Sequence, residues 1–267
     1  MKVYHPQAPY QGIPAENVYC VADDMGVEVG VGYVIFFYQP DLFPERPINL
    51  YLNMEAQPAA QYMLFGAMLA RAKQLRDQYP NLKARIYTQA DTADSQTCEF
   101  YLRNGFTLDD AEDMVRLTLP ETPSKLPMSC SIANVPLNNE FEQNAFLARM
   151  NQSRIAQLNL GTLDVCRQQP HFLALALYRN NQIIGELLVT GQGYRCELVG
   201  MYVVGPYRKM GMGKALLHRA MELLKAEGVT QLNAVVLRRS PAQCALAQSF
   251  GATFLKTTGL YPGVNLD

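Results

Sequence analysis

The feature that most constrains this chain is a glycine-rich segment at 203–214, Val-Val-Gly-Pro-Tyr-Arg-Lys-Met-Gly-Met-Gly-Lys. An apolar run typical of a strand precedes it at 196–204, and an amphipathic helical pattern follows it at 215–228. Glycines let backbone N–H groups converge, and a helix N-terminus adds unpaired donors and a partial positive charge. The segment also carries three basic side chains, Arg208, Lys209 and Lys214. It therefore predicts a binding site for a phosphate or pyrophosphate.

Two well-known phosphate-binding loops do not fit these residues. A P-loop requires Ser or Thr after its Gly-Lys pair to hold magnesium, but Ala215 stands at that position. A dinucleotide-binding fingerprint requires Gly-x-Gly-x-x-Gly, but Leu216 replaces the third glycine. The pattern that remains is Arg208-x-x-Gly211-x-Gly213 between a strand and a helix.

This pattern resembles the GNAT superfamily of acyl-CoA-dependent N-acyltransferases, whose Gln/Arg-x-x-Gly-x-Gly/Ala loop binds the pyrophosphate of the cofactor. The context is also similar, since a strand pattern follows at 231–237, then a short helix at 241–250 and Gly251. The resemblance implies acetyl-CoA as the cofactor. The residues expected to bind it are Val203, Val204, Arg208, Lys209, Met210, Gly211, Met212, Gly213 and Lys214.

In that family the strand before the loop separates from its neighbour at a bulge, and the pantetheine arm of CoA pairs with the exposed backbone. By position, Tyr202, Val203 and Val204 would make this pairing here, and Gly200 is the expected site of the bulge. A backbone N–H of the same strand would stabilise the oxyanion, an interaction worth about 3 kcal/mol in other enzymes.

The reaction also needs a way to deprotonate the acceptor. An alkylamine with a pKa of about 10.4 is mostly protonated at neutral pH, so a base or a water path must take the proton. Glu197 is the expected base, because its position eleven residues before Arg208 resembles that of the catalytic glutamate in the histone-acetylating branch. Strand alternation places Glu197 on the face shared by Val199, Met201 and Val203.

The expected proton donor to the leaving thiolate departs from the family pattern. Many members carry Tyr-x-x-x-Gly-Phe on the last helix, but Ala247 occupies the tyrosine position here. Tyr202, Tyr207 and Tyr261 are alternative donors, of which Tyr202 is the predicted catalytic residue. Unassisted departure is a further alternative, because a thiol has a pKa of only about 8.5.

The order of expected elements repeats with an offset of 148 residues, so that the helix at 67–75 aligns with 215–223. We interpret the chain as an α/β (α+β) protein of two tandem GNAT-like modules, each a mixed, mostly antiparallel sheet flanked by helices. The prediction places a degenerate module at 1–120, a linker at 121–127 and a catalytic module at 128–267.

The two predicted modules differ in the residues available to bind a cofactor. The first is expected to start with an irregular segment at 1–17 and to end with a strand at 114–119. Its loop position, 60–65, has neither a glycine nor a basic residue at the key places, so only the second module is predicted to bind acyl-CoA. The acceptor pocket is expected from early helices at 139–165 and a late hairpin at 257–264.

Composition excludes several classes of partner. A net charge of −1 with dispersed basic residues argues against nucleic acid. The longest apolar runs, 62–70 and 172–178, fall short of the roughly 20 residues that span a membrane, and the N-terminus lacks an apolar signal core. We expect a cytoplasmic protein without a membrane partner, and a homodimer stays open. The cysteines and histidines lack metal-ligand spacing, so no metal is expected.

The leading expectation is an N-acetyltransferase that transfers an acetyl group to a primary amine of a small-molecule or peptide acceptor. The alternative is a non-catalytic acyl-CoA-binding sensor or interaction protein, which the missing tyrosine favours. Release of free CoA in the presence of amines distinguishes the two. The sequence leaves the acceptor open among antibiotic amines, polyamines, amino acids, peptide N-termini and protein lysines.

Overall fold

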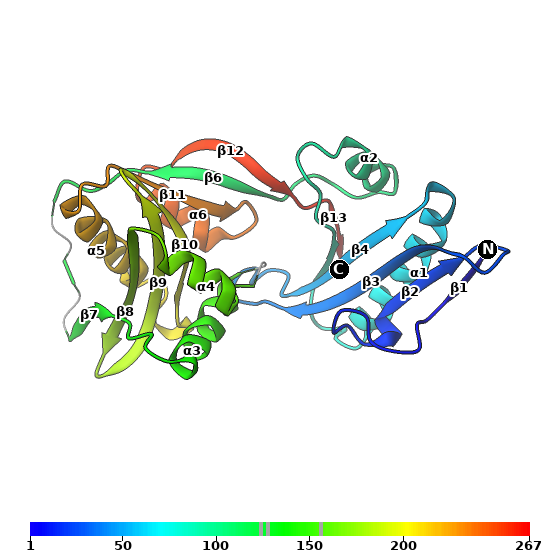
Figure 1. Cartoon of the computed structure of the whole chain (residues 1–267), viewed down its shortest axis with the longest axis horizontal. Helices are drawn as coiled ribbons and strands as arrows, with labels where there is room; N and C mark the ends of the chain where they lie inside the picture. The colour runs from blue at the N-terminus through cyan, green and yellow to red at the C-terminus, as the bar shows by residue number, and fades with distance from the viewer. Residues whose placement is uncertain (123–124, 127–128, 155–156) are drawn as a thin grey trace. The chain divides into compact units, whose positions relative to one another are not determined.

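The computed structural model describes residues 1–122, 125–126, 129–154 and 157–267. The chain divides into two compact units, one comprising Met1–Ala111 with Gly259–Asp267 and the other Glu112–Thr258. Each unit has its own sheet and its own buried core, and Figure 1 identifies their elements.

The first unit is built on a six-stranded sheet in the order β1-β2-β3-β4-β5-β13. Its strands are β1 (Lys2–Tyr4), β2 (Val18–Ala22), β3 (Glu28–Tyr38), β4 (Ile48–Ala56), β5 (Ala84–Tyr87) and β13 (Gly263–Leu266), and its helices are α1 (Pro58–Asp77) and α2 (Ser95–Arg103). Neighbouring strands are antiparallel except β4 and β5, which run parallel because α1 carries the chain back between them. The buried face of α1 packs on the sheet through residues spaced three or four apart, Ala60, Leu64, Met68, Ala72 and Leu75.

The second unit is built on a seven-stranded sheet in the order β12-β6-β11-β10-β9-β8-β7. Its strands are β6 (Ala111–Leu117), β7 (Cys130–Asn134), β8 (His171–Arg179), β9 (Gln182–Gln192), β10 (Arg195–Val203), β11 (Gln231–Leu237) and β12 (Thr253–Leu260). Its helices are α3 (Glu140–Met150), α4 (Leu160–Arg167), α5 (Met212–Ala226) and α6 (Pro241–Gln248). The apolar side of α5 packs on one face of the sheet, while α3 and α4 pack on the opposite face (Figure 1).

Both sheets repeat one arrangement, in which a helix joins two parallel neighbours within an otherwise antiparallel sheet. In the second unit, α5 joins β10 to β11 as α1 joins β4 to β5 in the first. The predicted fold class, two mixed and mostly antiparallel sheets flanked by helices, is confirmed.

Two strands, β6 and β13, belong to the other unit's sheet and not to the sheet that their order in the chain predicts. The strand predicted at 114–119 to close the first module is β6, which lies between β12 and β11 in the seven-stranded sheet. Its apolar positions Val115 and Leu117 are buried in the core of the second unit. Conversely, β13 pairs antiparallel with β5 in the six-stranded sheet. The predicted late hairpin at 257–264 is therefore wrong, because β12 and β13 belong to different sheets.

The N-terminal segment also differs from its prediction. Residues 1–17 are not wholly irregular, because β1 pairs antiparallel with β2 over Lys2–Tyr4. The predicted linker at 121–127 lies partly outside the described residues.

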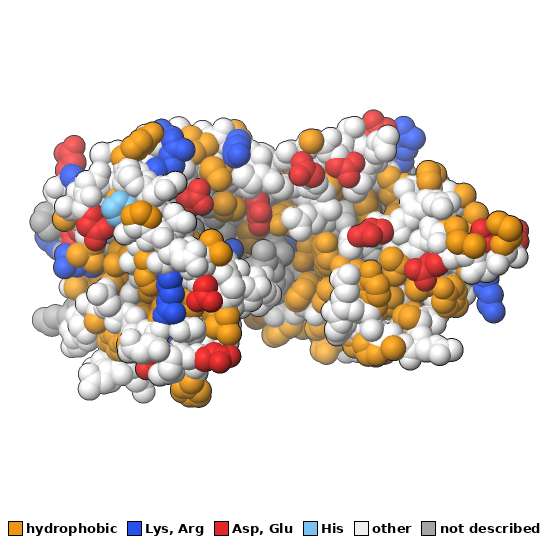
Figure 2. Space-filling model, viewed as in Figure 1, with side chains coloured by type: hydrophobic (Ala, Val, Ile, Leu, Met, Phe, Trp, Pro, Cys, Tyr) orange, Lys and Arg blue, Asp and Glu red, His pale blue; other side chains and the backbone are white. Residues whose placement is uncertain are grey.

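No helix within the described part of the chain is long and apolar enough to cross a membrane. On the face in Figure 2, acidic and basic side chains are intermixed with apolar ones.

A buried guanidinium in the first unit provides a stability test. Arg85 is only 1% exposed, and its NH1 and NH2 donate to the Asp109 carboxylate at 3.1 and 2.5 Å. Desolvation raises the pKa of Asp109, but hydrogen bonds from Arg85 and Thr107 outweigh it, so the pKa is lowered overall. The stabilisation is therefore present above the ordinary carboxyl pKa and lost as pH falls through the lowered one.

We expect Asp109→Asn to lower the free energy of unfolding by about 1–3 kcal/mol near pH 7, because the buried Arg85 loses a charged partner. The difference from wild type should shrink as the pH falls, since the wild-type carboxylate then becomes protonated. Denaturant unfolding across a pH series measures both effects. Asp77→Asn is the control and should change little, because the Asp77 carboxylate is exposed and lies 3.9 Å from Arg76. A pH-independent loss in Asp109→Asn would contradict the assignment.

Candidate functional site

Strand β10 separates from β11 part-way along its length. The two strands pair in parallel only from Arg195 opposite Gln231 to Leu198 opposite Ala234. At the next step a bulge shifts the register of β10 against β9, between Leu198 and Gly200. A bulge bends its strand and increases its twist. Beyond it, β10 stays with β9 while β11 stays with β6, and the bulge predicted near Gly200 is confirmed.

The separation opens a pocket of about 290 Å³ between the two strands, which we call the wedge pocket. Residues 198–201 of β10 line one side and residues 234–237 of β11 the other. Further lining comes from α5 and α6 through Leu217, Leu246 and Ala247. The wedge pocket thus combines an apolar lining with a strand edge that has no neighbouring strand, which suits an extended chain carrying amide groups.

The glycine-rich loop, residues 204–211, follows β10 and leads into α5. Lys209 and Gly211 adopt left-handed backbone conformations, with φ of 59° and 78°. Such residues beside right-handed ones turn successive N–H groups toward one point, which makes an anion-binding concavity. Gly211 is the N-cap of α5 and provides no capping side chain, so the first N–H groups of the helix lack an intrahelical partner. The loop therefore has the backbone geometry of an anion site.

The basic side chains of this loop have different positions. Lys209 and Lys214 are exposed, and the Lys214 ammonium lies 5.9 Å from the centre of the Phe250 ring. The Nε of Arg208 donates to the Val203 carbonyl at 2.6 Å, which ties the loop to the end of β10.

Three apolar residues among the predicted cofactor ligands turn inward, whereas Met210 is exposed. Met212 and Val203 are buried in the core beneath α5, and Val204 packs against that core as well. Residues of this kind can meet a ligand through their backbone rather than through their side chains.

Glu197 lines the wedge pocket and also a second pocket. Within the described residues, its carboxylate has no hydrogen-bond or ion-pair partner. Its predicted face is partly wrong, because the bulge interrupts the alternation of β10. Met201 and Val203 pack toward α5, whereas Val199 packs toward α3 and α4. Glu197 shares the face of Val199, since it pairs with Thr190, whose hydroxyl donates to a carbonyl of α4.

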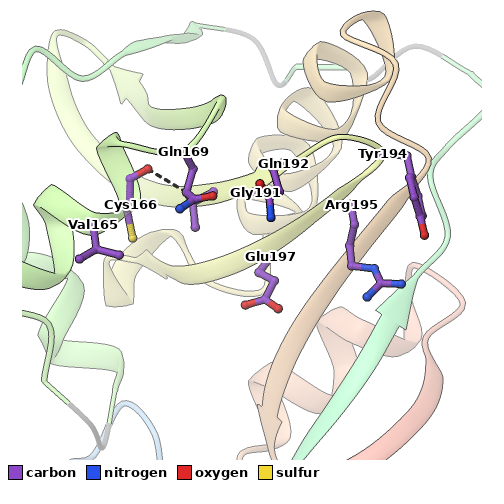
Figure 3. A pocket seen from close by; sticks show the side chains of 9 residues that line it. Val165, Cys166, Gln169, Gly191, Gln192, Tyr194, Arg195 and Glu197 are labelled. Carbon is purple, nitrogen blue, oxygen red and sulfur yellow. Dashed lines mark hydrogen bonds between the residues drawn. The ribbon is translucent and has the colours of Figure 1, made fainter.

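The second pocket, which we call the hairpin pocket, has a volume of about 460 Å³ and lies beside the β9–β10 hairpin (Figure 3). It is lined by Val165, Cys166, Gln169, Thr190, Gly191, Gln192, Tyr194, Arg195 and Glu197. Thr190 Oγ1 donates to the Cys166 carbonyl at 2.9 Å and so fixes α4 against β9. Glu197 is therefore common to the linings of the two pockets.

Tyr202 lies away from these pockets, in a buried polar cluster. Its hydroxyl donates to Glu186 at 2.7 Å, and Arg149 donates to the same fully buried carboxylate at 2.7 and 2.8 Å. Burial, and then the hydrogen bond to Glu186, raise the pKa of Tyr202. The structure does not bring the Tyr202 hydroxyl to Glu197, and this geometry favours a structural role.

The other candidate proton donors are also elsewhere. The ring of Tyr207 lies 5.4 Å from the Arg179 guanidinium, and Tyr261 belongs to the first unit. Ala247 does line the wedge pocket, so the position at which the family carries its tyrosine faces the expected reaction site with only a methyl group.

The first unit has no counterpart of the loop. Its β4 ends at Ala56 and α1 begins at Pro58, so Gln57 alone separates them. Residues 60–65 lie within the helix, where Ala60 and Leu64 are buried.

Sequence reasoning missed two arginines at the site. Arg195 lies two residues before Glu197 on the same strand, so period-two alternation was an available signal. The Arg154 guanidinium donates to the Val199 carbonyl at the bulge and lines the wedge pocket. No local pattern marks Arg154, because only the tertiary fold brings it to β10.

Comparison with known proteins agrees with this geometry. Residues 136–252 match the Acetyltransferase (GNAT) family. Among solved structures, a GCN5-related N-acetyltransferase from Sphaerobacter thermophilus has a TM-score of 0.51 and 14% identity, over 96% of this chain and 82% of the other. A probable N-acyltransferase from Enterococcus faecalis V583 has a TM-score of 0.51 and 10% identity, over 92% and 61%.

A tandem GNAT protein from the clavulanic acid biosynthesis pathway also matches, with a TM-score of 0.46 and 11% identity, over 93% of this chain and 82% of the other. The search of curated proteins gave no match. The two structures with a TM-score of 0.51 show the fold alone at these identities. The family match supports acyl-CoA-dependent N-acetyltransferase activity in general terms. Residues 136–252 of this chain are thus similar in sequence to the GNAT acetyltransferase family.

Proposed function

We propose that the second unit is an acetyl-CoA-dependent N-acetyltransferase that acetylates a primary amine of a small-molecule or peptide acceptor. The observation that carries the proposal is the position of Glu197, which lines both the wedge pocket and the hairpin pocket and whose carboxylate has no partner among the described residues. An acyl donor in one pocket and an amine in the other would meet at this side chain.

The second unit has a proposed binding place for the pyrophosphate and for the pantetheine arm of acetyl-CoA. The N–H groups of the loop and of the first turn of α5 would hold the pyrophosphate, with Lys209 and Lys214 adding positive charge. The wedge pocket would take the pantetheine arm along the open edge of β10. When bound, acetyl-CoA supplies the activated acyl group. Since the first unit has no loop between β4 and α1, we propose that it is a degenerate module and that only the second unit binds the cofactor.

Glu197 would act as the base that takes a proton from the acceptor. An ammonium is not nucleophilic, so the proton must leave before or during attack on the thioester, and a carboxylate between the two pockets can accept it directly or through one water. Backbone N–H groups beside the bulge are the proposed donors to the oxyanion.

The residues that line the wedge pocket include no tyrosine that could protonate the leaving thiolate. Ala247 lines the pocket but contributes no hydroxyl. A thiol of pKa about 8.5 can leave as the anion, although more slowly than with an acid. The same observation favours the second candidate function, a sensor that binds acyl-CoA without transferring the acyl group.

We expect Gly211→Asp to weaken acetyl-CoA binding by at least about tenfold, because it adds a carboxylate to the anion site and a side chain at a left-handed residue. Calorimetric titration with acetyl-CoA measures the change. Gly66→Asp introduces the same charge at an open position on α1 and is the matched control. An unchanged dissociation constant for Gly211→Asp would exclude the loop as the cofactor site.

Glu197→Gln should lower kcat by about 10²–10⁴-fold while acetyl-CoA binding persists, since the base is lost and the loop is untouched. Its pH profile should also lose the limb that reports ionisation of the base. Thiol release with a panel of amines gives both readouts, and Glu99→Gln on α2 is the control. Unchanged turnover with an unchanged pH profile would remove Glu197 from the mechanism. Tight acetyl-CoA binding by the wild type, without CoA release for any amine, would favour the sensor.

Tyr202→Phe should lower the free energy of unfolding by about 1–3 kcal/mol, because the fully buried Glu186 carboxylate loses a hydrogen bond. Thermal unfolding measures this loss. A fall in kcat as large as that of Glu197→Gln, with stability unchanged, would instead identify Tyr202 as the acid.

A further inference from the structure

We propose that the acceptor is an amine that also carries a carboxylate, as an α-amino acid does, and that Arg195 binds this carboxylate while Glu197 faces the amine. The inference rests on the proposed function and assigns a substrate class to the hairpin pocket.

The charges of the hairpin pocket are the first argument. Arg195 and Glu197 are the two charged residues of its lining. Figure 3 shows both side chains extending to the same side of β10. Residues two apart on a strand are separated by about 6.4–6.8 Å, and each side chain reaches its ligand at about 2.8 Å. Because both side chains are on one face of the strand and line one pocket, a small molecule that carries an amine and a carboxylate would reach both.

Two polar side chains of β11 lie next to these charges. In the parallel register Gln231 stands beside Arg195 and Asn233 beside Glu197, with side chains on the same face. Asn233 is only 5% exposed, and its Oδ1 has no hydrogen-bond partner among the described residues. The Oε1 of Gln231 is likewise buried without one. An unsatisfied buried amide oxygen costs about 1–3 kcal/mol, and both atoms are hydrogen-bond acceptors. Neither residue is among those that line the hairpin pocket, so the two amides border the site rather than form its surface.

One lining amide lies beside the carboxylate end of the proposed acceptor. Gln192 pairs with Arg195 across the β9–β10 hairpin and lines the same pocket, so its amide would donate to the carboxylate that Arg195 binds. A guanidinium binds a carboxylate through two parallel hydrogen bonds, which also orients the molecule.

Competing acceptor classes fit these charges less well. A polyamine carries several ammonium groups, but the lining offers a single carboxylate and a guanidinium that repels a second cation. A protein lysine side chain has no anion near its amine. A phosphate monoester carries up to two negative charges, which exceeds the single positive charge of the lining.

The test compares each of the twenty protein amino acids with its own α-carboxamide, which keeps the amine and removes the carboxylate charge. Aminoalkyl phosphates form a third arm. For the full chain with acetyl-CoA, release of CoA gives kcat/KM for each acceptor. For the preferred amino acid we expect at least about a tenfold advantage over its amide, corresponding to about 1.4 kcal/mol.

Substitutions of Arg195 test whether this residue causes the preference for the acid over the amide. Arg195→Gln should reduce the acid-to-amide ratio by tenfold or more, mainly by lowering kcat/KM for the acid. Arg195→Lys keeps the positive charge but cannot form two parallel hydrogen bonds to a carboxylate. Its acid-to-amide ratio should therefore lie between those of the wild type and Arg195→Gln. Arg103→Gln, at an exposed ion pair on α2, should leave the ratio unchanged.

Each remaining outcome counts against the inference. Amides used as well as acids, or a ratio unchanged in Arg195→Gln, would overturn it and leave the proposed function standing. A preference for an aminoalkyl phosphate would also overturn it, because the anion bound by Arg195 would then be a phosphate and not a carboxylate. Bound acetyl-CoA without CoA release for any acceptor would overturn the proposed function, and the inference with it.

Discussion

The bulge between Leu198 and Gly200 is the constraint on which the candidate site depends. It lets β10 follow β9 to its end while β11 keeps its pairing with β6, and a strand edge opens between them. An open edge inside a sheet leaves backbone groups that need partners. Two arginines supply some of them, because Arg154 donates to the Val199 carbonyl and Arg208 to the Val203 carbonyl. Both ends of the opening are thus held by guanidinium groups from outside the strand.

Two carboxylates near this opening have opposite environments. Glu186 is fully buried and accepts hydrogen bonds from Arg149 and Tyr202, so it joins α3 to the sheet as part of a rigid framework. Glu197 is exposed on the same face and has no such partner among the described residues. A carboxylate that accepts hydrogen bonds from two side chains is held in place, whereas an exposed one is accessible to a substrate. Glu186 and Glu197, eleven residues apart in the sequence, thus have a structural role and a proposed catalytic role, respectively.

The sequence predicted most elements because their patterns are local. The run that became β3 is β-branched and aromatic, and the helix start at Asp94 is marked by a capping side chain that accepts from Thr97. The loop was recognisable for the same reason, since its glycines and basic residues are contiguous. Local patterns do not identify the sheet that a strand joins, so β6 and β13 were placed with the wrong neighbours. Arg154 and Asn233 could not be selected for the same reason, because only long-range pairing brings them to Glu197.

The placement of β13 has a consequence for how the protein is made. The six-stranded sheet pairs residues 84–87 with residues 263–266, so during synthesis β5 must wait at a sheet edge until the whole second unit has been translated. Unpaired strand edges invite wrong pairings, and non-local contacts slow folding. The first unit therefore cannot complete its sheet in the order in which it leaves the ribosome. In this chain, a stretch beyond the proposed catalytic residues closes the fold of a unit that was begun first.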